Sequence, residues 1–395
     1  MSDRFLVIGI SDGTDPVFEP SLVRRIAAAP VASGGVRHHA IVSSLLSPDV
    51  CWIDITVPLE NVFSRYRDID GEIIVFASGD PLFYGFAATL KNHFPDASIE
   101  VIPAFNSLQM LAHRLAEPYG NMICVSLTGR PWRGFYAALI SQPPLMGVLT
   151  DRRHTPGAIA RQMLRFGYDN YLMAVGERLG NRDERVAWYQ LSEAVDREFE
   201  MPCSVMLRRT HNRNLPFGIP DRLFAHLDGR PGMMTKMPIR LLSISMLGLE
   251  HRTELWDIGF CTGSISIEAR LRFPMLGITA FERRKECHAI LEENCCRFGA
   301  PGIEDVIGDF MECDLSALPR PDAVFIGGHG GRLREMLARI TGVMLPGCCI
   351  VFNSVSAQSR EDFAGACAAL GLRITTTHTV SLDSYNPVTI MRAER

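Results

Sequence analysis

The sequence lacks the cysteine spacing of a metal-binding protein, although it contains eleven cysteines. No C-x-x-C occurs, and Cys295-Cys296 and Cys348-Cys349 are adjacent pairs. Structural zinc and iron–sulfur sites draw their thiolates from defined short spacings, so we predict no metal site. We expect most of these cysteines to be buried free thiols in a reducing compartment, which favours a cytoplasmic protein.

Long apolar runs and a surplus of positive charge are also missing. No stretch approaches the roughly 18 apolar residues of a transmembrane helix. The apolar run in "MSDRFLVIGISDG" covers six residues, which is too short for the hydrophobic region of a signal peptide. The net charge of −4 argues against a nucleic-acid binder, since such proteins tend to be basic. We therefore expect neither a membrane nor a nucleic acid as a partner.

The length and the order of apolar segments indicate two α/β domains. A chain of 395 residues exceeds what one hydrophobic core usually supports. The stretch "THNRNLPFGIPD", around 210–220, is polar, contains two prolines and has no periodicity, as linkers do. We predict domains at 1–210 and 218–395, joined by a linker at 211–217.

Both predicted domains alternate strand-like and helix-like segments, the pattern of an α/β fold. Several strand candidates are apolar throughout, as strands covered on both faces tend to be. Helical patterns include "SLVRRIAAA", "SLQMLAHRLA" and "PGAIARQMLRFG". The predicted strands are 4–10, 72–78, 98–103, 122–128, 145–150, 171–177 and 203–209 in the first domain, and 254–258, 277–281, 303–307, 322–326, 348–353, 373–380 and 388–392 in the second.

The stretch "LWDIGFCTGSISIEARL" in the second domain predicts a strand, a tight turn and a helix. The loop runs Gly259-Phe260-Cys261-Thr262-Gly263 after Asp257. Dinucleotide-binding loops use G-x-G-x-x-G and place a pyrophosphate on the helix N-terminus. Here Ser264 stands where the helix opens and there is no third glycine, so the loop suits a ligand's close approach but makes a poor pyrophosphate cradle.

Acidic residues follow the next two predicted strands. Glu282 ends the second strand, where an acid can bind ribose hydroxyls, and Asp309 and Phe310 follow the third, where an amide acceptor and an aromatic face suit adenine. Acids after three strands, with no basic group reserved for phosphate, favour an adenosine ligand without phosphates. S-adenosylmethionine fits this pattern; NAD and an ordinary strand-to-helix turn stay open as alternatives.

The second domain resembles a known family. "DIGFCTGSISIE", "FERR", "VFIGGHGG" and "NPVTI" are similar to the precorrin-6B C15-methyltransferases (decarboxylating), which have a Rossmann-like class I fold. The resemblance covers about 218–395 and implies S-adenosylmethionine as the cofactor. It adds Thr235 to the residues expected at the cofactor, and Lys236, Gly328, His329 and Asn386 beside the tetrapyrrole. An ordinary glycine-rich turn around His329 stays open.

The first domain resembles the tetrapyrrole methylases, and their precorrin C5-methyltransferase branch in particular. "ASGDPLFYGFA" carries the resemblance, with "SGGVRHHAIV", "IPAFNSLQMLAHRL" and "VSLTGR" following the same order over roughly 4–207. It implies two α/β subdomains and a second S-adenosylmethionine site. The implied cofactor residues are Gly79, Asp80, Leu82, Phe83, Tyr84 and Ser107, and Arg130 and Arg153 are candidates for the substrate carboxylates.

Together the two halves resemble the bifunctional precorrin-6Y C5,15-methyltransferases (decarboxylating) or their cobalt-precorrin counterparts in cobalamin biosynthesis. The resemblance implies a precorrin or cobalt-precorrin substrate, and we expect a homo-oligomer. No catalytic acid, base or nucleophile is predicted, since orientation supplies most of the rate. The opening loop departs from the family pattern: Ser11, Asp12 and Asp15 replace residues that bring no pair of acids.

Two alternatives to this reading remain. In the first, both folds are kept but the methyl acceptor is an RNA, a protein or another small molecule. In the second, only the second domain is an active methyltransferase, and the first domain, with its altered opening loop, is a binding or scaffolding module.

Overall fold

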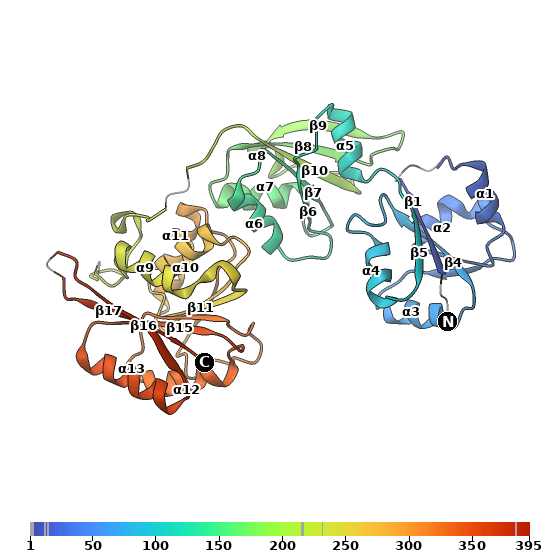
Figure 1. Ribbon diagram of the computed structural model, residues 1–395. Helices are drawn as coiled ribbons and strands as arrows, with labels where there is room; N and C mark the ends of the chain where they lie inside the picture. Colours follow the sequence, from blue (N-terminus) through green and yellow to red (C-terminus); the bar gives the residue numbers. More distant parts are fainter. Residues whose placement is uncertain (1–3, 12, 14–15, 215–216, 231, 384) are drawn as a thin grey trace. The chain divides into compact units, whose positions relative to one another are not determined.

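The computed structural model describes residues 4–11, 13, 16–214, 217–230, 232–383 and 385–395. The chain divides into two compact units (Figure 1). The first comprises Met1–Arg130, Pro143–Arg161 and Tyr171–Thr210, and the second comprises Pro131–Gln142, Gln162–Asn170 and His211–Arg395. The predicted linker at 211–217 stays a prediction, and Leu215 and Pro216 lie outside the described residues.

A parallel five-stranded sheet forms the first part of the first unit, in the order β3-β2-β4-β1-β5. Alternate residues of its central strand β1 enter opposite cores: Phe5 and Val7 pack with α3 and α4, while Leu6 and Ile8 pack with α1 and α2. Coverage of both faces explains why this strand is apolar throughout. The elements are β1 (Arg4–Ile10), α1 (Pro20–Ala27), β2 (Val31–Gly34), α2 (Val36–Val42), η1 (Ser43–Leu45), β3 (Cys51–Asp54), α3 (Glu60–Arg67), β4 (Glu72–Ser78), α4 (Phe86–His93) and β5 (Ser98–Ile102).

A second five-stranded sheet, of mixed direction, follows in the order β6-β7-β10-β8-β9. Helix α5 packs on it through Leu111 and Ala112, which share a core with Leu145, Ala174 and Met206. Helix α6 belongs to the second unit, and α7 begins in the first unit and ends in the second. The elements are α5 (Ser107–Leu115), β6 (Ile123–Ser126), α6 (Arg133–Ser141), β7 (Leu145–Leu149), α7 (Pro156–Arg165), β8 (Tyr171–Glu177), β9 (Arg185–Gln190), α8 (Leu191–Ala194) and β10 (Cys203–Arg209).

The second unit contains a seven-stranded sheet in the order β13-β12-β11-β14-β15-β17-β16, in which β17 runs antiparallel to both neighbours. Helices α12 and α13 cover one face, and α9, α10 and α11 lie on the other (Figure 1). The elements are η2 (Asp221–Leu223), α9 (Met237–Leu247), η3 (Leu249–His251), β11 (Glu254–Ile258), α10 (Ser264–Arg272), β12 (Gly277–Glu282), α11 (Glu286–Phe298), β13 (Glu304–Ile307), β14 (Ala323–Ile326), α12 (Leu333–Val343), β15 (Cys349–Ser354), α13 (Ala357–Ala369), β16 (Arg373–Val380) and β17 (Val388–Glu394).

The fold confirms the predicted α/β class, with a Rossmann-like sheet in the second unit. Every predicted strand is present within about two residues of its predicted bounds. Three strands were missed: β2, β3 and β9. The first two have four residues each, and β9 is only partly buried, so none carries a long apolar run. Among the described residues, no helix has both the length and the apolar character needed to cross a membrane.

Candidate active sites

The turn after β11 needs glycine at two positions. Gly259 has φ +81°, and a Cβ there would lie 2.7 Å from the backbone nitrogen of Gly328. Gly263 has φ +74°, and a Cβ there would lie 2.2 Å from Leu291 Cδ1. Left-handed backbone disfavours larger residues at both positions, and the backbone of Gly328 also leaves no space for one at Gly259. The backbone of the turn therefore packs against the loop after β14, and α10 begins directly after it.

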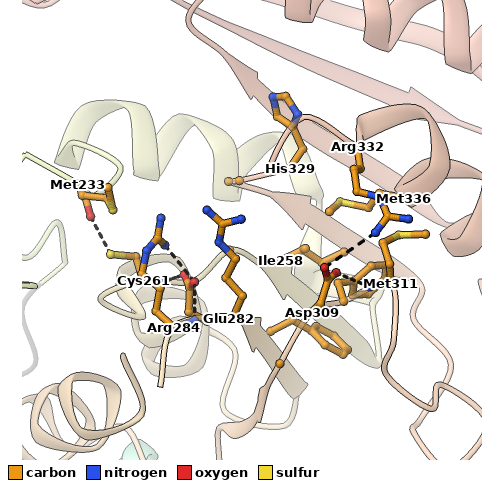
Figure 2. Close-up of a pocket in the computed structure, with 18 residues that line it drawn as sticks. Met233, Ile258, Cys261, Glu282, Arg284, Asp309, Met311, His329, Arg332 and Met336 are labelled. Atoms are coloured by element: carbon orange, nitrogen blue, oxygen red, sulfur yellow. Dashed lines mark hydrogen bonds and ion pairs between the residues drawn. The ribbon is translucent and has the colours of Figure 1, made fainter. Parts of the chain in front are cut away.

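Glu282, the last residue of β12, is buried and bonded to this turn. Its Oε2 accepts the backbone N–H of Cys261 at 3.2 Å. Its Oε1 accepts the backbone N–H and the guanidinium of Arg284 at 3.2 and 3.0 Å (Figure 2). The carboxylate is thus held where β11 and β12 end at the same sheet edge.

A cavity of about 410 Å³ opens at this edge, within the usual size range of small-molecule sites (Figure 2). We call it the acidic cavity, because Glu282 and Asp309 both line it. Asp309 Oδ1 accepts the backbone N–H of Met311 at 2.9 Å, and its Oδ2 lies 3.9 Å from Arg332. The sequence-predicted residues in its wall are Gly259, Cys261, Glu282, Asp309, Phe310, Gly328 and His329.

Phe310 is part of both the cavity wall and the core. It is 5% exposed, and its ring lies edge-on to Phe281 with centroids 5.1 Å apart. The sequence predicted an aromatic face open to adenine at this position. Most of the Phe310 surface is instead used in packing against Phe281 and Trp256.

A second cavity of about 470 Å³ adjoins the acidic cavity, with Gly259, Cys261 and Gly327 in the walls of both. We call it the adjoining cavity. Lys236 Nζ lies in its wall, 5.4 Å from the centroid of the Tyr385 ring. The sequence-predicted residues that line only this cavity are Thr235, Lys236, Asp257, Phe260 and Asn386. Thr262 and Gly263 shape the turn but are in neither wall.

Asp257 and Thr262 have unmet hydrogen-bonding capacity at the turn. Ser266 Oγ donates to Oδ2 of Asp257 at 2.6 Å, but Oδ1 of Asp257 and Oγ1 of Thr262 have no partner among the described residues. Burial raises the pKa of Asp257 to about 7. Buried polar atoms are nearly always bonded in native proteins, so this turn is suited to a polar ligand or ordered water.

Three arginines that were not predicted from the sequence line the acidic cavity, at an edge where no basic group reserved for phosphate was expected. Arg284 is paired with Glu282 at 3.0 Å, and Arg332 is paired with Glu335 at 2.6 Å. Arg283 also lines the cavity. The "FERR" motif contains two of them, but their approach to the cavity depends on how the strands align.

The turn offers no reactive thiol. Cys261 Sγ donates to the backbone oxygen of Met233 at 3.0 Å, and burial raises the pKa of this thiol above its ordinary value. The neighbouring Cys287 is buried too, and its pKa is raised to about 12. Thiolates rather than thiols are nucleophiles, so neither cysteine supplies one at neutral pH.

In the first unit, the turn after β4 is closely packed against two other segments. Gly79 has φ +61°, its N–H donates to Ile10 at 2.7 Å, and its carbonyl accepts from Ala104 at 3.3 Å. A Cβ on Gly9 would lie only 2.0 Å from the Gly79 oxygen. Asp80 Oδ1 accepts the N–H of Leu82 at 2.9 Å and closes the turn.

A cavity of about 380 Å³, the first-unit cavity, lies beside this turn. Of the residues predicted from the sequence, Gly79, Phe83, Tyr84 and Ser107 are in its wall, while Asp80 and Leu82 are not. Ser107 is the first residue of α5, whose Asn106 cap accepts from Gln109 at 2.9 Å. Neither a carboxylate nor a Lys or Arg side chain is in the wall as far as the structure describes the chain, unlike the acidic cavity.

His38 and Ser78 also line the first-unit cavity. Ser78 lies in the "ASGDPLFYGFA" motif that carried the prediction, whereas no cofactor contact was predicted for His38 of "SGGVRHHAIV". His38 Nδ1 accepts the N–H of Gly35 at 3.2 Å, so the neutral ring carries its hydrogen on Nε2, which is 3.0 Å from Ser78 Oγ. Arg37 also donates to that oxygen at 2.8 Å. Burial lowers the pKa of His38 to about 4, which keeps the ring neutral.

The two arginines predicted to meet the substrate lie outside this wall. Arg130 stacks over the Tyr84 ring at 4.9 Å, which places it next to a cavity residue. Arg153 is exposed, and its backbone N–H donates to Asp151 at 2.8 Å. In the opening loop, Ser11 is in the wall, whereas Asp12 and Asp15 lie outside the described residues.

Two family models match the chain, one in each half. The family described as "Precorrin methyltransferase domain" matches residues 224–394, and the family described as "Tetrapyrrole (Corrin/Porphyrin) Methylases" matches residues 60–195. The first match contains the acidic cavity's carboxylates, and the second contains Gly79, Tyr84 and Ser107.

Curated relatives match both the whole chain and its halves. A precorrin-6Y C(5,15)-methyltransferase [decarboxylating] from Sinorhizobium sp is 32% identical over 379 residues, covering 94% of this chain and 89% of the relative. From Salmonella typhimurium, a cobalt-precorrin-6B C(15)-methyltransferase (decarboxylating) is 33% identical over 42% of this chain and 85% of its own length. A cobalt-precorrin-7 C(5)-methyltransferase from the same organism is 30% identical over 51% of this chain and 97% of its own. With two half-chain relatives and one that spans nearly the whole length, the chain belongs to the precorrin-6Y C(5,15)-methyltransferase (decarboxylating) family.

Proposed function

We propose that this chain methylates a precorrin or cobalt-precorrin at C15, with loss of CO2 from the ring C acetate, and at C5. S-adenosylmethionine is the methyl donor at both sites. The observation that carries the proposal is the presence of two separate cavities at strand-to-helix turns, in a chain that aligns over 94% of its length with a bifunctional relative.

The acidic cavity has the groups that an adenosine needs. Glu282 is fixed at the end of β12, where its oxygens can accept from ribose hydroxyls. Asp309 follows β13, and Gly308 beside it leaves open space where a Cβ would otherwise project. Oδ1 of Asp257, which has no partner among the described residues, lies at the same turn but in the wall of the adjoining cavity. These residues fit S-adenosylmethionine, whose sulfonium supplies a transferable methyl group.

The adjoining cavity is suited to the methyl acceptor. It shares Gly259 and Cys261 with the acidic cavity, so a molecule in each would meet across the same turn. Methyl transfer needs donor and acceptor in line, and two cavities that share wall residues at one turn are suited to hold them close together. Lys236 and Asn386 in the wall are a cation and an amide for the carboxylates of a tetrapyrrole.

The first-unit cavity binds its ligand mainly through backbone and neutral groups. Its wall contains the Gly79 turn, the start of α5 at Ser107 and the rings of Phe83 and Tyr84. Burial raises the pKa of Tyr84, so its hydroxyl stays neutral and donates to Cys124 at 2.8 Å. This wall is suited to the adenine and the neutral edge of the same cofactor, with C5 methylation as its reaction.

The chain's residues contribute by binding and orientation rather than by covalent catalysis. A meso carbon of the reduced macrocycle is itself nucleophilic, and the conjugated ring accepts the electrons released when CO2 leaves. The protonated thiols at the turn agree with a reaction that needs no protein nucleophile. Placing both sites on one chain raises the effective concentration of the intermediate at the second site it visits.

Product analysis tests the proposal. Full-length enzyme, S-adenosylmethionine and precorrin-6B, or its cobalt form, are incubated and the product mass is measured. Two methyl groups gained and one CO2 lost are expected. A product without methyl gain from either form would contradict the proposal. A homo-oligomeric assembly and a cytoplasmic location remain predictions from the sequence.

A further inference from the structure

Arg283 is an uncompensated cation in the acidic cavity. It follows Glu282, is exposed, and has no hydrogen-bond or ion-pair partner among the residues that the structure describes. The other two arginines of the wall differ, since Arg284 is paired with Glu282 and Arg332 with Asp309 (Figure 2). Arg332 is also paired with Glu335. The nearby carboxylates are therefore already engaged, and Arg283 is left to meet an anion from outside the chain.

The Arg283 guanidinium lies beside the glycine-rich loop after β14. Its Nη1 is 3.4 Å from the point that a Cβ of Gly330 would occupy. Gly330 and Gly331 have φ +54° and +84°, and a Cβ on Gly331 would meet nothing within 4 Å. The loop thus leaves open space next to the cation, bounded by backbone rather than by side chains.

His329 adds a hydrogen-bond donor to the same wall. Its Nδ1 accepts the N–H of Gly331 at 3.3 Å, so the hydrogen of the neutral ring is on Nε2. The ring lies edge-on to Phe352, with centroids 5.8 Å apart, which holds its orientation. Arg283 and His329 thus both line the acidic cavity, the first with a guanidinium and the second with an imidazole N–H.

We propose that Arg283 and His329 form a carboxylate-binding site at the acidic cavity. A guanidinium gives two parallel N–H bonds to a carboxylate, and such charge-assisted bonds are stronger than neutral ones. The site rests on the proposed function, which supplies two carboxylate sources. One is an acetate or propionate side chain of the tetrapyrrole, and the other is the α-carboxylate of the cofactor.

The test uses the full-length variant Arg283→Gln, with Arg284 left in place. Arg334→Gln is the matched control, since Arg334 is a surface arginine of α12 paired with Asp362. Calorimetry measures binding of S-adenosylhomocysteine and of methylthioadenosine, which lacks the amino-acid carboxylate. Steady-state kinetics measure KM and kcat for C15 methylation, and a thermal melt followed by circular dichroism reports whether the variant is folded.

Each result decides for or against the site. If the tetrapyrrole carboxylate binds there, KM at C15 rises about 10-fold or more while both binding constants stay unchanged. If the cofactor carboxylate binds there, the affinity for S-adenosylhomocysteine falls about 10-fold and the affinity for methylthioadenosine does not change. In either case His329→Ala shifts the same quantity, and Arg283→Lys restores part of it.

The proposal is overturned if Arg283→Gln behaves like Arg334→Gln in all three measurements. It is also overturned if methylthioadenosine weakens as much as S-adenosylhomocysteine, because Arg283 would then contact the adenosine. Failure of the wild-type enzyme to methylate either tetrapyrrole would instead contradict the proposed function, and the two binding measurements would still test the cofactor source.

Discussion

The Oε2 atom of Glu282 lies 3.2 Å from the backbone nitrogen of Cys261, and this bond joins the end of β12 to the turn after β11. Cys261 has φ +49°, a conformation that costs a residue with a side chain about 1 kcal/mol or more. The carboxylate thus helps to hold the turn in the shape that separates the acidic cavity from the adjoining one. Because Glu282 is the last residue of β12, its carboxylate lies at the sheet edge and within hydrogen-bond distance of the turn after β11.

Two substitutions of Glu282 distinguish the effect of its charge on cofactor binding from the effect of its hydrogen-bond acceptors. Glu282→Ala removes the proposed acceptor for the ribose hydroxyls, and charge-assisted bonds of this kind contribute roughly 1.5–3 kcal/mol each. We expect S-adenosylhomocysteine to bind the second unit at least about 10-fold more weakly, as measured by calorimetry. Glu282→Gln should lose less of this affinity, since the glutamine side chain keeps one oxygen acceptor. Unchanged affinity in the alanine variant would remove Glu282 from the site.

Gly259→Ala tests the close approach of the turn to the β14 loop. The new Cβ would lie 2.7 Å from Gly328 N and 2.9 Å from its Cα, both of which are backbone atoms that cannot move aside alone. Gly371→Ala is the control: Gly371 also has a positive φ, +71°, but a Cβ there meets nothing within 4 Å. We expect Gly259→Ala to abolish C15 methylation and Gly371→Ala to retain it. Equal loss in both variants would mean that backbone strain, not the contact, is responsible.

The buried carboxyl of Asp257 makes stability depend on pH. Its pKa is about 7 in the fold, whereas the ordinary value is 3.8. Between these two pH values the folded state therefore holds a proton that the unfolded chain has lost. The free energy of unfolding therefore falls as pH rises from about 4 to about 7. Glu282 and the protonated thiol of Cys261 are the titratable neighbours, and neither offers a positive charge.

Asp257→Asn should flatten this dependence. We expect the loss of unfolding free energy between pH 5 and pH 8 to shrink by roughly 2–3 kcal/mol, since one pKa unit corresponds to about 1.4 kcal/mol. Denaturant titration of the full chain at both pH values measures it. Some slope should remain, because burial also raises the pKa of Glu254 to about 7. The same slope in the variant as in the wild type would contradict the assignment.

The opening loop of the first unit gives a prediction from the sequence alone. Two like charges about 6 Å apart at an effective dielectric near 20 repel by roughly 2–3 kcal/mol, so we expect the acids Asp12 and Asp15 to weaken binding of a polycarboxylate substrate. Ser11→Gly combined with Asp12→Pro should raise the C5 rate and leave the C15 rate unchanged. If the C5 rate does not rise, or C15 changes equally, the loop does not limit the first site.

The sequence predicted the parts of the fold that depend on local pattern. Apolar strands such as β1 and β11 were found because both faces of each are covered, and the glycines of the 259–263 turn were found because they punctuate such a strand. The short β2 was missed because "VASG" has little apolar character. Its Gly34 is closely packed in the fold, since a Cβ there would lie 3.1 Å from both the His38 and Trp52 side chains.

Glu282 ends β12 and Asp309 follows β13, and both were predicted because polar residues at strand ends meet at one sheet edge. Thr235, Lys236 and Asn386 were expected only from the family resemblance. Arg283 also follows β12, but its approach to the cavity, like that of Arg332, depends on loop geometry that no local pattern predicts. Thr262 shows the reverse case. It is part of the turn motif, yet the turn directs it away from both cavity walls.

The most direct test of the account is the number of cofactor molecules that one chain binds. Calorimetric titration of the full-length protein with S-adenosylhomocysteine should give two equivalents per chain. Gly259→Ala should reduce this to one, and Gly79→Ala should remove the other, since Gly79 has φ +61° and a Cβ there would lie 3.0 Å from Asn106 Cα. A stoichiometry of one for the wild type, unchanged by Gly79→Ala, would contradict the account and make the first unit a scaffold for the second.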